Sequence, residues 1–200
     1  MKKFRYLLFL FVVMGAITAC VEKSQGANSI VNSSCNIPCW QNITPGVTKA
    51  EKLDLWLHAI PDMDGNKITR LPSWNKYDEI YMFSFQDKKS DGAIYIVEDR
   101  VESIVIYGDL GIPLEQVIKL YGEPEKIIIS SAVIPVLFGS GIVLEVYLVY
   151  PQSGSAFSFY NSNLDLITIE PNVLIRKVVF SESNNIVNIV SPKEQALEVL

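Results

Sequence analysis

Two stretches of the chain place apolar residues at the spacing of an amphipathic helix. The first stripe consists of Leu53, Trp56, Leu57 and Ile60, and the second of Leu114, Val117, Ile118 and Tyr121, both at positions i, i+3, i+4 and i+7. From Leu53 to Leu114 the chain advances by 61 residues (114 − 53). The pattern therefore predicts two short helices, each with one apolar face, that begin two successive units of the chain.

Residues that favour helix ends flank both stripes. Thr48 and Glu51 have capping-box spacing before the first helix. Pro113 lies near the first turn of the second helix, where a missing N–H is tolerated, and Gly122 follows its last turn. These residues fix the expected bounds of both helices.

Runs rich in β-branched and aromatic residues predict antiparallel strands after each helix. The first set covers 79–85, 92–98 and 100–108, and the second covers 126–131, 142–150, 154–160 and 173–180, with 164–170 as a candidate extra strand. The apolar stripe of each helix must pack on another layer, and a sheet face is the available surface. The predicted fold class is α+β, with two tandem α-β-β-β repeats, each a short helix packed on an antiparallel sheet.

The N-terminus predicts export from the cytoplasm. Three cations precede an uncharged apolar run over 6–16, which is shorter than the roughly 20 residues of a membrane-spanning helix. Such a run, followed by small residues, is typical of a signal peptide. The segment Ile17-Thr18-Ala19-Cys20 resembles the lipobox of bacterial lipoproteins, which implies cleavage before Cys20 and lipidation of its thiol. The alternative is an ordinary secreted signal peptide with a chance cysteine.

A lipidated Cys20 would anchor the protein to the membrane, because each buried methylene adds about 0.8 kcal/mol. By the same resemblance, Val21 gives no signal for inner-membrane retention, so the outer membrane is the expected location if the host has one. Residues 21–34 are mostly polar and predict a flexible tether of about 20 Å root-mean-square length.

Cleavage would remove three cations, which takes the formal net charge from −5 to −8 (−5 − 3). The Lys and Arg residues are not clustered, so the sequence does not predict nucleic-acid binding.

The predicted organisation follows from these patterns. It consists of a signal peptide over 1–19, a lipidated cysteine and tether over 20–34, a first α/β repeat over 35–109, a second over 110–190, and a C-terminal helix over 191–200. The last helix is expected because Ser191 and Glu194 again have capping-box spacing.

Two cysteines, Cys35 and Cys39, remain for the folded part. A cysteine pair outside the cytoplasm favours a disulfide. The Cys-x-x-x-Cys spacing, taken with the single histidine His58, is also similar to copper chaperones of the thioredoxin-like Sco family, which implies an alternative metal or thiol-redox site. A structural zinc site needs four ligands and this set supplies three. We therefore predict no metal and no other cofactor.

The segments that contain the two helices resemble the opening of the SmpA/BamE-like lipoprotein domains. The matching residues are Ile43, Gly46, Thr48, Tyr121, Gly122 and Pro124, whereas Val47 replaces the usual Met and Ile60-Pro61 replaces the expected Leu-Gly. The tandem arrangement is similar to beta-lactamase inhibitor proteins, which bind with their sheet faces. The Pro-Cys-Trp segment before Ile43 is similar to uncharacterised bacterial lipoproteins. The resemblance implies antiparallel strands and a protein-binding role.

No residue set predicts catalysis. A Ser-His-Asp relay would require His58, and no Gly-x-Ser-x-Gly segment is present. Residues 61–68 lack the Gly and Glu that a calcium-binding EF-hand loop needs at its sixth and twelfth positions, so they predict a turn. Acidic residues such as Asp54 and Glu102 are spaced as solvated surface residues.

Two regions are candidate binding surfaces. Residues 132–138 are predicted as a loop or irregular sheet edge, either buried over the sheet or exposed as an apolar patch. Its large apolar residues include Ile134, Val136, Leu137 and Phe138. Tyr95 and Tyr107 would form an aromatic patch of the kind enriched at protein interfaces if they share the solvent face.

These observations predict a membrane-anchored, extracytoplasmic lipoprotein that is not an enzyme and that binds or scaffolds a protein of the cell envelope. One alternative is a copper chaperone or thiol-redox protein that uses Cys35, Cys39 and His58. Another is a module that senses a small ligand or the cell wall across the sheet face.

Overall fold

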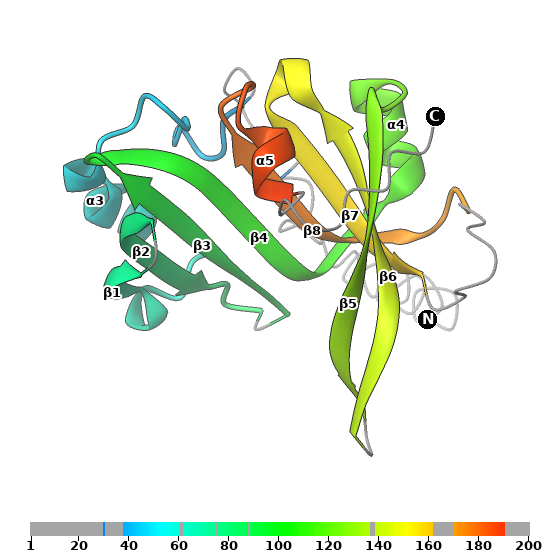
Figure 1. Cartoon of the computed structure of the whole chain (residues 1–200). Helices are drawn as coiled ribbons and strands as arrows, with labels where there is room; N and C mark the ends of the chain where they lie inside the picture. Colours follow the sequence, from blue (N-terminus) through cyan, green and yellow to red (C-terminus); the bar gives the residue numbers. More distant parts are fainter. Residues whose placement is uncertain are drawn as a thin grey trace, which may run out of the picture.

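The computed structural model describes residue 30 and residues 38–60, 62–74, 76–87, 89–136, 139–161 and 170–190. Within them the chain forms a mixed fold that is mostly sheet, with one eight-stranded antiparallel sheet in the order β1-β2-β3-β4-β8-β7-β6-β5 (Figure 1). The strands are β1 Thr69–Trp74, β2 Tyr77–Ser84, β3 Ser90–Val97, β4 Arg100–Pro113, β5 Lys126–Val136, β6 Gly139–Tyr150, β7 Ser155–Asn161 and β8 Leu174–Ser181.

Three short α-helices accompany the sheet in residues 38–190 as far as they are described: α3 Leu53–Ala59, α4 Leu114–Tyr121 and α5 Ile186–Val190. Single turns of 3-10 helix cover Ala50–Lys52, Gly65–Lys67 and Pro151–Ser153. Helices α3 and α4 pack on one face of the sheet, called here the inner face, whereas α5 packs on the other, the outer face. Among the described residues, no helix is long and apolar enough to cross a membrane.

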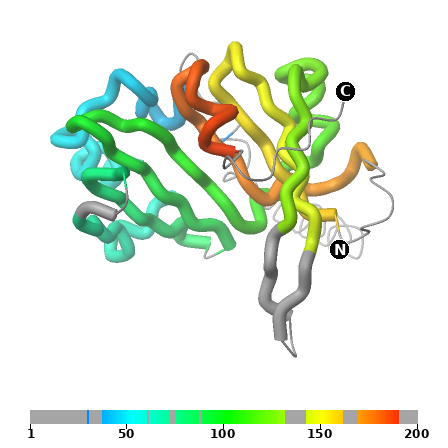
Figure 2. The backbone as a smooth tube through the Cα atoms, in the orientation of Figure 1, coloured from blue at the N-terminus to red at the C-terminus, as the bar shows by residue number. Residues whose placement is uncertain are grey.

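The eight strands form two meanders that meet at their last strands. Strands β1 to β4 follow α3, strands β5 to β8 follow α4, and β4 pairs with β8 (Figure 2). The predicted α-β-β-β unit is wrong in its strand count, because four strands follow each helix. The strands also form one continuous sheet, because the backbone of β4 is paired on both sides, with β3 and with β8.

The inner face holds the main hydrophobic core. Strand residues that alternate toward α3 and α4 are almost fully buried, among them Phe83, Ile94, Ile106, Phe157 and Phe180. Their period of two is the pattern expected of a strand with one buried face. Trp40 joins this core from the N-terminal segment, with its ring stacked on Phe83 at a centroid distance of 5.3 Å. At Gly92 a Cβ atom would lie 2.2 Å from the Phe83 ring, so this position requires glycine.

Strand β1 was not predicted from the sequence. Its edge position explains the miss, because an edge strand pairs on one side only and needs no run of buried residues. Strand β5 forms the opposite edge and continues through residues 132–136, where a loop or irregular edge was predicted. Each edge strand contains a proline, Pro72 in β1 and Pro135 in β5. Proline is tolerated there because an edge strand leaves one row of N–H groups outside the ladder.

The caps predicted for the second helix are correct, whereas the cap predicted for the first helix is wrong. Pro113 is the N-cap of α4, and Gly122 is its C-cap with a φ of 80°, as the sequence predicts. Thr48 is not the N-cap of the first helix. Its hydroxyl instead accepts a hydrogen bond from the backbone N–H of Thr44 at 2.9 Å, in the turn before the helix. The capping box predicted for Thr48 and Glu51 is therefore wrong.

The chain contacts the core before the predicted first repeat begins. Ile30, in the segment predicted as a tether, is 3% exposed and belongs to the inner core. Trp40 and Ile43 exchange backbone hydrogen bonds at 3.0 and 2.8 Å across a tight turn. The predicted signal peptide over 1–19, the candidate strand over 164–170 and the predicted terminal helix over 191–200 lie outside the described residues, apart from Glu170.

Candidate functional site

Tyr95 and Tyr107 lie on the same face of the sheet. Tyr95 is paired with Ser103, and Tyr107 is paired with Asp91 on one side and with Lys177 on the other. Residues that are directly opposite in a ladder share a face, and Lys177 and its neighbour Val179 lie on the α5 side. Both tyrosines are half-buried. They therefore belong to the outer face of the first meander.

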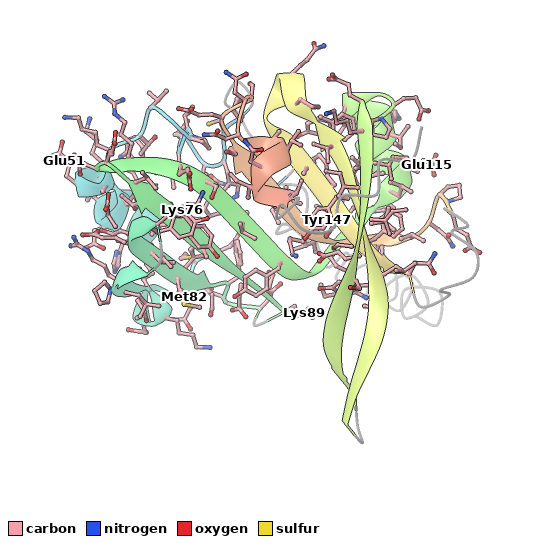
Figure 3. All side chains as sticks on the ribbon, viewed as in Figure 1. Glu51, Lys76, Met82, Lys89, Glu115 and Tyr147 are labelled. Carbon is pink, nitrogen blue, oxygen red and sulfur yellow. The ribbon has the colours of Figure 1, made fainter. Side chains whose placement is uncertain are left out.

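Helix α5 covers only the second meander and the junction. It contacts β6, β7 and β8, and the apolar cluster beneath it contains no residue of β1, β2 or β3. On the outer face of the first meander, Leu71 is 37% exposed and Met82 is 39% exposed. Figure 3 labels Lys76 and Met82 over the first meander and Tyr147 in the second. The outer face of the first meander is thus a partly exposed surface of aromatic and aliphatic side chains.

A polar cluster lies beside Tyr95 on this surface. It consists of Lys76, Tyr77, Tyr95, Glu102 and Ser103, and is called here the Glu102 cluster. The rings of Tyr77 and Tyr95 are 4.6 Å apart, and the Lys76 ammonium lies 5.0 Å from the centre of the Tyr77 ring. The same ammonium bonds Oε1 of Glu102 at 3.1 Å. The cluster therefore joins the beginning of β2 to β3 and β4.

A β-bulge places Glu102 in the cluster. Tyr95 is paired with Ser103 and Ile96 with Val101, so Glu102 is the extra residue on β4. A bulge turns such a residue out of the regular alternation, and the Glu102 side chain is only 17% exposed. The expectation that Glu102 is a solvated surface residue is therefore wrong. The sequence does carry a signal for the bulge, because two polar residues, Glu102 and Ser103, separate the buried Val101 and Ile104, where regular alternation would place one.

Two polar atoms of the cluster have no hydrogen-bond partner among the described residues. They are Oε2 of Glu102 and Oγ of Ser103, and both are buried. Buried polar groups in proteins are nearly always paired, since an unpaired group loses about 1–3 kcal/mol of desolvation energy. The Glu102 cluster is therefore an incompletely satisfied polar site beside an exposed aromatic surface.

The charges of the cluster shift several pKa values. Burial alone would lower the pKa of Lys76, but the hydrogen bond to Glu102, together with the charges of Tyr77 and Glu102, outweighs it and raises that pKa. Burial raises the pKa of Tyr77, against the opposing charge of Lys76. Burial also raises the pKa of Tyr95. At neutral pH the site thus holds an ammonium ion and two neutral phenols.

A second polar cluster lies on the outer face of the second meander. Nζ of Lys177 is 2.6 Å from Oε1 of Glu145, and the same oxygen accepts a hydrogen bond from Oγ of Ser158 at 2.8 Å. Nζ of Lys177 also donates to Oη of Tyr147 at 2.8 Å. Burial and the negative charge of Glu145 raise the pKa of Tyr147. None of these four side chains has a buried unpartnered atom in the part of the chain that the structure describes.

The other predicted binding residues lie apart from the Glu102 cluster in the fold. The backbone places Ile134 and Val136 near the end of the edge strand β5, where Ile134 is paired with Gly141 and Val136 with Gly139. Leu137 and Phe138 lie outside the described residues. The structure therefore separates the two surfaces that the sequence predicts, because β5 and β3 are on opposite sides of the β4–β8 junction.

The predicted cysteine and histidine positions are partly described. Cys39 is 1% exposed and is disulfide-bonded. Cys20 and Cys35 lie outside the described residues, so lipidation and the Cys35–Cys39 pairing stay predictions. His58 is on the exposed side of α3, with Nδ1 2.7 Å from the carbonyl oxygen of Asp54. Within the described residues, no three His, Cys, Asp or Glu side chains are grouped to hold a metal ion.

No family model matches the chain, and no curated protein and no solved structure matches it.

Proposed function

We propose that this protein is a lipid-anchored, extracytoplasmic binding protein of the cell envelope, without enzymatic activity, that presents the outer face of its first meander to a protein partner. The observation that carries the proposal is the group of exposed apolar side chains that lies beside the tyrosines of the first meander, away from α5. Helix α5 packs on the second meander and the junction, whereas Leu71 and Met82 of the first meander are more than one-third exposed beside the tyrosines. On the second meander, Tyr160 shares the face of its partner Glu145 and is exposed to a similar extent.

The composition of this surface supports a protein partner. Tyr and Met are enriched at the centres of protein interfaces, where large amphipathic side chains contribute most of the binding energy. Tyr77, Tyr95 and Tyr107 are half-buried, so the strands already hold their rings in place. A partner would therefore bind without a large loss of side-chain entropy.

The anchor is proposed on the sequence alone. The lipobox-like segment that ends in Cys20 supports lipidation, and the outer membrane is the proposed location if the host has one. Cysteine lipidation with more than one acyl chain gives stable membrane attachment. A short connection from the anchor to the buried Ile30 would hold the folded part close to the membrane surface.

The strand order supports a further proposal, that the two meanders are repeats of one unit. Each unit comprises a short helix and four antiparallel strands, and the order reads the same from either edge of the sheet. The first residues of α3 and α4, Leu53 and Leu114, are separated by the 61 residues that also relate their apolar stripes. This arrangement supports the resemblance to tandem inhibitor-like proteins.

A site-specific crosslinking experiment in cells tests the proposed function. A photo-reactive amino acid replaces Met82 on the outer face in one variant, and replaces Leu55 in a control variant. Leu55 is 74% exposed on α3, on the opposite side of the sheet. We expect one envelope protein to be captured from position 82 and not from position 55. Capture from both positions alike, or from neither, would contradict the proposal.

A further inference from the structure

The Glu102 cluster already holds one ammonium ion of the chain itself. Lys76 lies in the turn before β2, its side chain is 60% exposed, and it reaches back to Oε1 of Glu102 across the Tyr77 ring. A carboxylate combined with an aromatic face is a recurring arrangement for binding cations. The position of Lys76 thus shows which chemistry the cluster accepts.

The unpartnered atoms show that the cluster has remaining hydrogen-bonding capacity. Oε2 of Glu102 and Oγ of Ser103 are buried without partners among the described residues, and Ser103 is 0% exposed. Both atoms accept hydrogen bonds, and one of them carries negative charge. An anion would be repelled by this carboxylate, and an apolar group would leave both atoms unpaired. A group that donates several hydrogen bonds and carries positive charge satisfies them.

An ammonium ion suits the cluster better than a guanidinium ion. Arginine binds a carboxylate best through both oxygens at once, in a planar fork. In the free protein the Glu102 carboxylate instead takes one ammonium, that of Lys76, on Oε1 alone. A partner lysine that displaces Lys76 would repeat the interaction that the cluster already makes. A lysine ammonium is compact and has three hydrogen-bond donors, so it can serve more than one acceptor at once.

We propose that the Glu102 cluster is a subsite for a lysine side chain of the protein partner, and that Lys76 occupies the mouth of this subsite in the free protein. The inference rests on the proposed function, which places the partner on this face. The formal net charge of −5 favours approach by a basic partner surface. Because Lys76 is exposed and lies in a turn, its side chain can swing into solvent while β2 stays in place.

A ligand titration tests the subsite directly. The probe is Nα-acetyl-lysine amide, and the matched control is Nα-acetyl-norleucine amide, which has a similar side-chain length but no ammonium. The full-length lipoprotein, purified in detergent with 3-fluorotyrosine in place of tyrosine, reports binding through the fluorine resonances of Tyr77 and Tyr95. We expect the lysine probe to shift both resonances and the norleucine probe to shift neither. Equal responses to both probes would overturn the proposal.

Three substitutions sharpen the titration. Lys76→Met removes the resident ammonium, so the lysine probe should bind about tenfold more tightly. Glu102→Gln keeps the shape but removes the charge, so the probe should bind at least about tenfold more weakly. Ser103→Ala is a second test at the same subsite and should also weaken binding. Absence of a response in both the natural protein and Lys76→Met would overturn the subsite.

The crosslinking experiment separates this proposal from the proposed function. If the partner is captured from position 82 equally well in the natural protein and in Glu102→Gln, the lysine subsite is wrong and the proposed function stands. If the probe binds in a Glu102-dependent manner but no partner is captured, the subsite stands and the proposed function is wrong. If Glu102→Gln removes both probe binding and capture, both proposals are supported.

Discussion

In the described part of the chain, each meander carries one Lys–Glu pair on the outer face. The positions of the lysine and the glutamate along the meander are exchanged between the two pairs. In the first meander Lys76 precedes β2 and Glu102 lies on β4; in the second, Glu145 lies on β6 and Lys177 on β8. In both pairs the lysine also lies about 5 Å from a tyrosine ring, 5.0 Å in the first and 5.2 Å in the second. The residue types are thus the same, while their positions on the second and fourth strands are exchanged.

The pairs differ in how completely their polar atoms are satisfied. Glu145 has an 8% exposed side chain, and its Oε1 has two partners, whereas Glu102 leaves Oε2 unpaired among the described residues. The second pair also lies beside the apolar cluster that α5 covers. The comparison teaches that the completeness of hydrogen bonding, rather than the presence of charged residues, distinguishes a structural ion pair from a candidate binding site.

The largest effect is expected from Lys177→Met. This change leaves the buried carboxylate of Glu145 without its cation, and breaking one side of a buried ion pair costs about 3–5 kcal/mol. Urea unfolding of the variant should show this loss in the free energy of unfolding. The double variant Lys177→Met with Glu145→Met should be more stable than the single variant, because it removes the buried charge. A loss below about 1 kcal/mol would mean that solvent reaches the pair.

Ile186→Ala should have the next largest effect. Ile186 is 0% exposed in the cluster between α5 and the second meander, and its truncation should cost about 2–4 kcal/mol. Met82→Ala is the matched change on the first meander and should alter stability by less than about 0.5 kcal/mol, because Met82 is 39% exposed. Thermal unfolding measures both. Similar losses in the two variants would show that the first meander is covered as well.

High pH should loosen the second meander more than the first. The second stacks Tyr121, Tyr150 and Phe157. The first also contains tyrosines with a raised pKa, Tyr77 and Tyr95, but the larger shifts belong to the second. Burial raises the pKa of Tyr121 and of Tyr150 from 10.0 to about 12. Both groups are therefore neutral more often in the fold than in the unfolded chain. Their contribution to stability is complete below pH 10 and is lost as the pH rises through about 12.

The measurement is urea unfolding at several pH values between about 9 and 11. Tyr150→Phe is the control, because a phenylalanine cannot ionise, and the free energy of unfolding of this variant should fall less steeply with pH. An equal slope in the natural protein and in Tyr150→Phe would show that Tyr150 does not contribute to the loss.

A small effect on stability is also expected from Lys76→Met. The Lys76 side chain is 60% exposed, and exposed ion pairs contribute about 0–1 kcal/mol. The free energy of unfolding should therefore change by less than about 1 kcal/mol, in contrast to Lys177→Met. A loss of about 3 kcal/mol would place Lys76 among the structural residues and remove the difference between the two pairs.

Regular periodicity made most of the fold predictable. The apolar stripe from Leu114 to Tyr121, closed by Gly122, gave the correct helix, and all seven strands after residue 76 follow β-branched or aromatic runs. The edge strand β1 carries Pro72 and little apolar alternation, so local pattern did not reveal it. Thr48 had the right spacing for a cap, but its hydroxyl bonds Thr44 instead. Contacts with other parts of the fold thus determined the edge strand β1 and the role of Thr48, which local sequence does not specify.

The candidate site was predictable only in part. Alternation indicated that Tyr95 and Tyr107 could share a face, and the ladder places them on the outer face. The contribution of Glu102 depends on a bulge opposite Tyr95. The two consecutive polar residues Glu102 and Ser103 mark a break in alternation, but the pairing with β3 is needed to assign the bulge. Lys76 and Tyr77 enter the site through contacts with Glu102 and Tyr95 on other strands, which no linear pattern records.

The junction between β4 and β8 sets the order of events during folding. The hydroxyl of Ser181 bonds the carbonyl of Glu102, a residue 79 positions earlier in the sequence. Strand β8 is also the last of the eight strands to be synthesised, so the sheet cannot close until nearly all of the folded part has been made. Closure of such a distant contact is slow because a long loop must first be ordered. The edge of β4 therefore stays unpaired until β8 joins it.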